Sequence, residues 1–175
     1  MAGDPLNKAL SEFRDQCIFR INENPGRLEN CLARISEDQL WQRLNNVTNS
    51  IGNLVLHLCG NARQYIISAL GNQPDMRERD SEFNTEAGPQ KKVLVATFNK
   101  TLEEVVDVIQ SASEKDLLKT YSVQGFTMSG MAMVIHVTEH LSYHMGQIAL
   151  LTKLLTGEDL GFYANIDLNQ KNKHD

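Results

Sequence analysis

The spacing of apolar residues restricts this chain to a helical fold. Between Gln90 and Gln110 apolar positions recur every three or four residues, as one face of a helix requires, and the same period runs through residues 5–35, residues 51–70 and a last stretch ending near Thr156. The sequence shows no alternation of strands with helices, so a parallel sheet is not expected. The pattern predicts an all-α protein, an antiparallel four-helix bundle with a long loop between helices 2 and 3.

Polar caps and glycines mark the ends of these helices. Ser36 is followed three residues later by Gln39, which is the spacing of a capping box, and Ser50 is placed to cap the second long helix. Gly71 is expected to end that helix in a left-handed conformation, and Gly157 is expected to stop the fourth helix. The fourth helix is predicted to begin near Thr127 or Ser129.

Three segments fall outside the long helices. Residues 71–89 are rich in Pro, Gly, Asn and charge, and a connection of this length is either functional or mobile. The stretch "LLKTYSVQGFTMSG" is expected to form a small hairpin or an extended connection, and the tail from about residue 157 is expected to be partly extended. Within the first helix, Pro25–Gly26 predicts a kink or a restart, with Asn24 as a cap for the second half.

The bulk composition bounds the class of protein. Residues 1–175 are expected to form a single domain, because single cores commonly reach this size. A net charge of -5 disfavours a nucleic-acid-binding surface, and apolar runs such as "IALLTKLL" are too short to span a membrane. The three cysteines have no close pair and the N-terminus has no signal-peptide pattern, so we expect a bacterial-type cytoplasmic location.

The stretch "HVTEHLSYHMGQ" carries the most specific functional signal. Neighbouring residues four apart on a helix differ by about 40° in direction, so His140 and His144 can converge on one point while His136 lies further round. A third imidazole would have to come from another helix, and His57, in a polar stripe with Asn53 and Asn61, is the natural candidate. The spacing therefore favours a metal site made of His57, His140 and His144.

Three neutral imidazoles suit Zn²⁺, Ni²⁺ or Fe²⁺ and leave a position for water or substrate. Gln147 returns to the same face as His144, where it could orient an imidazole or a bound water. Asn53 and Asn61 are candidates for the outer shell or the pocket, or they satisfy loop carbonyls. His136 is interpreted as a neighbour of the site. Hydrogen-bonded histidines in a metal-free bundle remain the alternative interpretation.

Other candidate groups are interpreted as structural. The loop motif "RERDSEF", from Arg77 to Phe83, could form a cationic lip for an acidic substrate, but a solvated charge cluster anchored by Phe83 is favoured. Cys59 and His57 are two residues apart on a helix and point to different sides, which disfavours Cys–His catalysis. Tyr65, Phe98 and three methionines of the fourth helix are expected in the core: Met131, Met133 and Met145.

Taken together, "SIGNLVLHLCGNARQYI", "RERDSEF" and "EHLSYHMGQIALL" resemble the DinB-like superfamily, and within it the small bacterial proteins of unknown function. The resemblance runs roughly from the first helix to Leu155. It implies a four-helix bundle with a metal held by one histidine of the second helix and two residues four apart on the last, which here are His57, His140 and His144. His136 is not a ligand that the resemblance implies.

Better understood members of that superfamily, which includes YfiT-like and mycothiol-dependent isomerase proteins, use low-molecular-weight thiols. We therefore expect a metal-dependent enzyme that activates water or a small thiol, as a hydrolase or a thiol transferase acting on a small molecule. The alternative is a non-catalytic, metal-stabilised binding or stress-response module. A homodimer is also compatible with a bundle of this kind.

Overall fold

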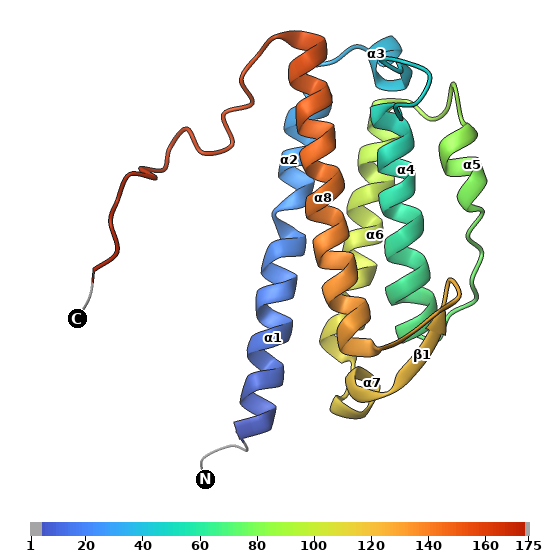
Figure 1. Ribbon diagram of the computed structural model, residues 1–175, viewed down its shortest axis with the longest axis vertical. Coiled ribbons are helices and arrows are strands. Elements are labelled where there is room, and N and C mark those ends of the chain that lie inside the picture. The colour runs from blue at the N-terminus through green and yellow to red at the C-terminus, as the bar shows by residue number, and fades with distance from the viewer. Residues whose placement is uncertain (1–4, 174–175) are drawn as a thin grey trace.

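The computed structural model describes residues 5–173 and confirms an all-α fold built around four long helical rods (Figure 1). The helices and strands, in chain order, are α1 (Pro5–Asn22), α2 (Asn24–Ala33), α3 (Glu37–Trp41), α4 (Ile51–Ala62), η1 (Arg63–Leu70), α5 (Arg79–Asn84), α6 (Lys91–Ser111), α7 (Glu114–Leu118), β1 (Thr120–Val123), β2 (Phe126–Ser129) and α8 (Gly130–Thr156). The pair α1–α2, the pair α4–η1, α6 and α8 form the four rods.

One detail of the bundle differs from the antiparallel arrangement expected. Helices α4 and α6 run in the same direction, because the connection between them follows the side of the bundle over most of its length instead of crossing one end (Figure 1). Trp41 marks the shared starting end, since its ring packs against both Gly52 near the start of α4 and Gly88 just before α6. This route carries α5 along the outer side of α4.

Helix ends confirm most of the predicted caps. The side chains of Ser36 and Ser50 each accept a hydrogen bond from the backbone three residues on, and both belong to complete capping boxes. Ser129 caps α8, so the strand residue Thr127 does not start that helix. Gly157 ends α8 with φ 72°, a left-handed conformation that favours glycine.

Two cap predictions are wrong. Asn24 does not accept hydrogen bonds at the start of α2; its Nδ2 donates to the carbonyls of Arg20 and Ile21 at 2.9 and 3.0 Å and so satisfies the end of α1. Gly71 has φ -83°, and Asn72 takes the left-handed conformation in its place. A side chain at Gly71 would crowd Val108 and the carbonyl oxygen of Ile67, which gives a packing reason for the glycine.

The second rod changes its winding partway along. Its second half, η1, is a π-helix, which amphipathic spacing over a few turns does not distinguish from an α-helix. The predicted hairpin is confirmed, with β1 and β2 paired antiparallel and Val123 opposite Phe126. Its two turn residues, Gln124 and Gly125, have φ values of 52° and 81°, as a type I′ turn requires.

The core lies between the four rods, with the cysteines free. Tyr65, Phe98, Met133 and Met145 are buried as predicted, and Met131 is partly buried against them. Cys31 and Cys59 are buried and Cys17 is partly exposed. Within the described residues, none of the helices has both the length and the apolar character needed to cross a membrane.

The segment after Gly157 contains turns but no helix or strand up to residue 173, and it leads away from the bundle (Figure 1). Its beginning is attached: Leu160 is buried, its carbonyl accepts a hydrogen bond from Asn30 at 3.2 Å, and Glu158 pairs with Arg34 at 2.9 Å.

Replacing Leu102 with alanine is expected to lower the free energy of unfolding by about 2–5 kcal/mol, because the lost side chain would leave a cavity. Leu102 is 2% exposed on α6, whereas Val93 on the same helix is 52% exposed, so Val93→Ala is the control and should change stability by less than about 0.5 kcal/mol. Denaturant unfolding followed by circular dichroism measures both. Equal losses would contradict the assignment of the buried face of α6.

Candidate metal centre

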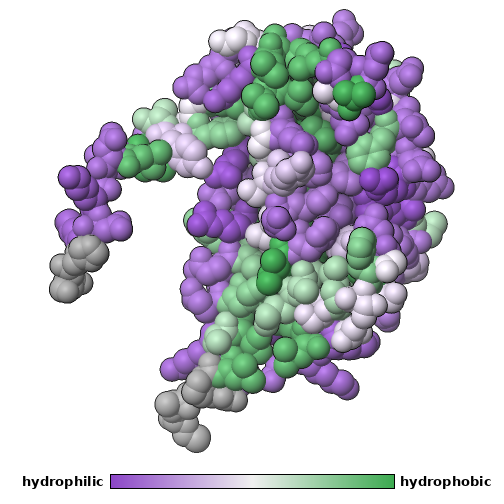
Figure 2. Space-filling model, viewed as in Figure 1, coloured by the Kyte–Doolittle hydropathy of each residue, from purple (hydrophilic) through white to green (hydrophobic). Residues whose placement is uncertain are grey.

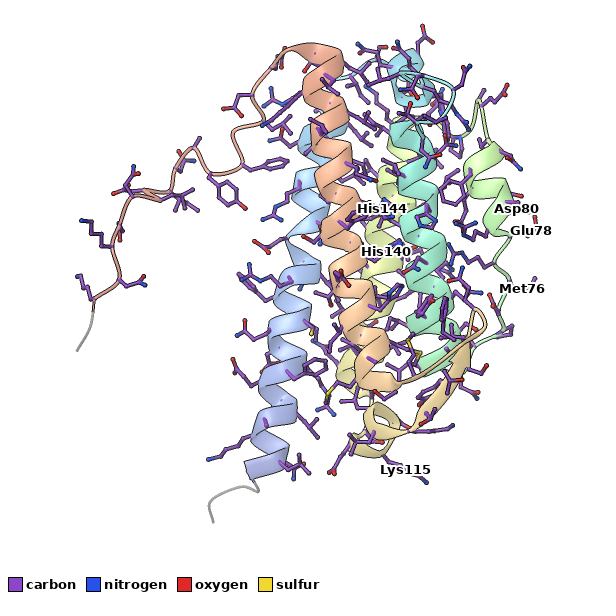
Figure 3. The ribbon with its side chains drawn as sticks, viewed as in Figure 1. Met76, Glu78, Asp80, Lys115, His140 and His144 are labelled. Carbon is purple, nitrogen blue, oxygen red and sulfur yellow. The ribbon has the colours of Figure 1, made fainter. Side chains whose placement is uncertain are left out.

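Three imidazoles from two neighbouring helices converge near the middle of the bundle. His57 comes from α4, and His140 and His144 come from α8, with one ring nitrogen of each lying within 4.8 Å of the other two. Figure 3 shows His140 and His144 on the side of α8 that faces α4. Figure 2, in the same view, shows hydrophilic residues over the middle of this face, with apolar areas towards both ends of the bundle.

The separation of two of these nitrogens matches a shared ion. The Nε2 atoms of His57 and His140 are 3.2 Å apart. Two ligands at zinc–nitrogen distances of about 2.0–2.1 Å and a tetrahedral angle are separated by about 3.3 Å. His144 completes the group, with its ring centroid 4.9 Å from that of His57 and 4.4 Å from that of His140. The residues present therefore fit a small divalent ion.

The tautomer of His57 follows from its hydrogen bonds. Its Nδ1 lies 2.8 Å from Oε2 of Glu82 and 3.2 Å from Nη2 of Arg77. The carboxylate can only accept, and it is the nearer partner, so Nδ1 carries the proton and donates it to Glu82. The Nε2 lone pair is then free on the side that faces His140.

A hydrogen bond to Gln147 determines the tautomer of His144. Oε1 of Gln147 lies 2.7 Å from Nδ1 of His144 and accepts a hydrogen bond from the Nδ1–H group, which leaves Nε2 as the nitrogen with a lone pair. Burial lowers the pKa of His144, an effect that the hydrogen bond to Gln147 partly opposes. His144 is therefore neutral near pH 7 and able to bind a cation.

His140 is the candidate ligand without an outer hydrogen-bond partner. Burial, together with the neighbouring charges of His144 and His57, lowers its pKa to about 3. Its Nδ1 is buried without a hydrogen-bond partner. Without a cation, His140 can place its proton on Nε2 and donate to His57; with one, Nε2 must lose that proton to present a lone pair. His140 is thus the ligand whose tautomer depends on the ion.

His136 lies beside this group and not within it. Its Nε2 is 3.3 Å from Nδ2 of Asn61, and its ring lies on Tyr65 with centroids 4.3 Å apart. The centroid distance to His140 is 5.4 Å. Asn61 therefore contacts this neighbour, while its own Oδ1 is buried without a partner. His174 lies outside the described residues.

Asn53 follows the structural interpretation considered above. Its Nδ2 donates to the carbonyl of Glu82 at 3.0 Å and to that of Thr85 at 2.7 Å, while its Oδ1 accepts from Ser50. Asn53 thus joins the start of α4 to the backbone of α5.

The interpretation of "RERDSEF" as a solvated charge cluster is wrong for two of its residues. The side chains of Arg77 and Glu82 are only 3% and 9% exposed, and they form an ion pair at 2.7 Å. Glu78 and Asp80 do lie on the outer side of this segment (Figure 3). Glu82 and Arg77 therefore lie beside the candidate ligands, although the charged sequence around them gives no sign of it.

Phe83 packs beside His57. The centroid of its ring is 4.6 Å from that of His57, and the guanidinium carbon of Arg79 lies 4.8 Å from the Phe83 ring centroid. The anchoring role expected for Phe83 therefore involves packing on a candidate ligand. The only sign of this packing in the sequence is the short helical segment at residues 79–84, and a segment of six residues in a run of charges is too short to be recognised as a helix.

A cavity of about 710 Å³ lies next to the Arg77–Glu82 pair. It is bordered by α4, η1 and the segment leading into α5, and its lining includes Leu56, Gly60 and Ile67. None of the three histidines lines it, so this cavity reaches the outer partners of the site and not the imidazoles.

A comparison with known proteins agrees with this picture of the fold. A family model described as "Protein of unknown function (DUF1572)" matches residues 9–166. A DinB-like protein from Bacillus cereus is similar in structure with a TM-score of 0.60 and 18% identity, over 77% of this chain and 87% of that chain. A DinB-like protein from Bacillus subtilis gives 0.62 and 17%, over 82% and 93%. No curated protein matches the sequence.

These likenesses confirm the DinB-like fold that the motifs suggested. At such identities the two crystal structures show the fold alone, so the chemistry must be inferred from the side chains.

Cys59 is expected to resist alkylation in the folded protein. It is buried, and burial raises the pKa of its thiol to about 12, so almost no thiolate is present at a pH of about 8. Timed iodoacetamide labelling followed by peptide mass spectrometry measures this, with the partly exposed Cys17 as the internal comparison and denatured protein as the positive control. Labelling of Cys59 as fast as Cys17 would reopen a role for this thiol beside His57.

Proposed function

The chain belongs to the DUF1572 family of proteins of unknown function, and from the geometry of its histidines we propose that it binds one divalent transition metal ion through His57, His140 and His144. We further propose that the loaded protein is an enzyme acting on a small molecule. The observation that carries the proposal is the convergence of three ring nitrogens within 4.8 Å, two of them with tautomers already fixed by outer partners.

The donor set indicates the kind of ion and its chemistry. Three imidazoles suit zinc, nickel or iron, and a bound ion of this kind would polarise water, lowering its pKa towards about 7, or stabilise a thiolate. The side chains around the ligands orient them. Glu82 accepts a hydrogen bond from His57, Gln147 accepts one from His144, and Phe83 packs beside His57.

Hydrolysis and thiol transfer both agree with this arrangement. Either reaction needs an open cationic position and a bound small molecule, and no ionised side chain among the three ligands favours one over the other. A low-molecular-weight thiol is the substrate class that the DinB-like resemblance suggests.

A non-catalytic role is the second candidate, and one observation favours it. The three histidines connect α4 to α8, so an ion held between them would tie two rods of the bundle together. Such an ion would stabilise the folded state through binding alone.

Alanine at His57, His140 or His144 is expected to weaken zinc binding by about 100-fold or more, since each change removes one of three ligands. His136→Ala is the matched control and should retain affinity within about tenfold. Competition with a chromophoric chelator, on protein without a histidine tag, gives the dissociation constants, and elemental analysis gives the metal content. Unchanged metal content in His144→Ala would refute the site.

Enzymatic activity is tested on protein reloaded separately with zinc, nickel or iron. We expect turnover with either a panel of thiol–electrophile pairs or a panel of esters and amides, and loss of that turnover in His140→Ala. Turnover of the first panel alone would assign thiol transfer, and of the second alone hydrolysis. If the ion raises the melting temperature while neither panel is turned over, the stabilising role is the correct one.

A further inference from the structure

We propose that Glu82 is a positioning residue of the metal centre, and that residues 77–85 form a clip that completes the site from outside the bundle. The clip acts by holding His57 in the one tautomer and orientation in which Nε2 faces His140. This inference rests on the proposed metal site, and it adds that the site depends on a residue outside the two helices that supply the ligands.

The carboxylate of Glu82 has every feature needed to orient an imidazole. Its Oε2 lies 2.8 Å from Nδ1 of His57, while Arg77 grips both oxygens, with Nε 2.7 Å from Oε1 and Nη2 2.9 Å from Oε2. The ion pair with Arg77 keeps the carboxylate charged, so the oxygen facing His57 is an acceptor.

Arg77 has its own second support, which fixes its guanidinium in place. Its Nη1 donates to Oε1 of Gln64 at 2.9 Å. Because two-pronged contacts between arginine and a carboxylate have a defined geometry, Glu82 cannot rotate away from His57 without breaking the ion pair. A buried carboxylate also needs this cation, since an uncompensated buried charge is strongly destabilising.

The clip packs against one face of α4. Asn53, His57 and Gly60 follow at intervals of four and three, which places them on the same side. Asn53 holds the backbone of the clip through the carbonyls of Glu82 and Thr85. At Gly60, a Cβ would overlap Oε1 of Glu82 and come within 3.1 Å of Nε of Arg77. The glycine thus leaves the space in which the ion pair lies.

The three candidate ligands differ in their outer partners, and the clip supplies the one partner that is an anion. His57 donates to an anion, His144 donates to a neutral amide, and Nδ1 of His140 has no partner. A carboxylate behind an imidazole increases its basicity, and loss of such a partner typically reduces metal affinity by about 10–100-fold. His57 is therefore the ligand at which loss of the outer partner is expected to lower metal affinity most.

The test begins with Glu82→Gln, which keeps the shape of the side chain and removes its charge. We expect zinc to bind about 10–100-fold more weakly than to the wild type, as measured by chelator competition at one fixed pH. Glu104→Gln is the matched control, since Glu104 borders the same cavity and pairs with Arg63 on the surface. Wild-type affinity within twofold in Glu82→Gln would overturn the inference.

Gly60→Ala tests the clip without altering any polar group. The added methyl should push the carboxylate away from His57 and weaken zinc binding by about tenfold. Gly26→Ala is the helical control, because a Cβ there would meet nothing within 4 Å. In the metal-free protein, nitrogen-15 NMR of His57 should show the proton on Nδ1 in the wild type and in Gly26→Ala, and a mixture of tautomers in Gly60→Ala.

A double variant separates positioning from general destabilisation. Glu82→Gln leaves Arg77 buried without its anion, and the combination Arg77→Met with Glu82→Gln removes that unpaired charge. If Glu82 positions His57, the double variant stays as weak a zinc binder as Glu82→Gln even when its melting temperature recovers. Recovery of zinc affinity together with stability would overturn the positioning role.

Zinc affinities of the wild type and of His144→Ala, measured in the same experiment, test the metal site itself. Equal, weak zinc binding by these two proteins would refute the proposed function. Tight wild-type binding that His144→Ala abolishes and Glu82→Gln leaves intact would refute only the role of Glu82.

Discussion

The hydrogen bond from His57 to Glu82 is the contact on which the arrangement of the candidate site depends. It joins a ligand helix to a segment that the chain reaches only after leaving the bundle, and it has consequences on both sides. Towards the bundle, it fixes the Nε2 lone pair of His57 against His140, 3.2 Å away. Towards the solvent, it requires a buried Arg77 to balance the carboxylate. The parallel direction of α4 and α6 is linked to this hydrogen bond. The connection between the two helices runs along the side of the bundle, and this course brings α5 alongside His57.

The sequence predicted what depends on regular periodicity. Apolar residues three and four apart located the four rods, since a buried face must repeat with the helix, and serines before helices located starts such as Ser50 and Ser129. The same regularity brought His140 and His144 to one face. Placing His57 opposite them needed the choice of a partner helix, and the polar stripe of α4 supplied it. The π-helical winding of η1 was not accessible, because its apolar pattern also fits an α-helix.

What the sequence did not predict are contacts made across long separations by polar residues. Glu82 and Arg77 sit in a run of charges, and only the tertiary structure distinguishes these two buried side chains from exposed neighbours such as Glu78. The prediction that Asn24 caps α2 was wrong for a related reason. An asparagine amide can accept a hydrogen bond at a helix start or donate one at a helix end, and the position of Asn24 between two helices allowed both. Gly71 was assigned by its conformation, whereas crowding by Val108 accounts for it.

The placement of charge around the histidines bears on the chemistry proposed for them. Glu82 is the one carboxylate hydrogen-bonded to a candidate ligand among the described residues, and Arg77 pairs with it, so this outer pair adds no net charge to the site. An ion on three neutral imidazoles would then keep its full positive charge, which a direct carboxylate ligand would have reduced. Such a centre favours an anionic fourth ligand, and hydroxide and thiolate are the two small anions through which hydrolysis and thiol transfer would proceed. The Glu82–Arg77 pair would thus orient His57 without adding net charge to the centre.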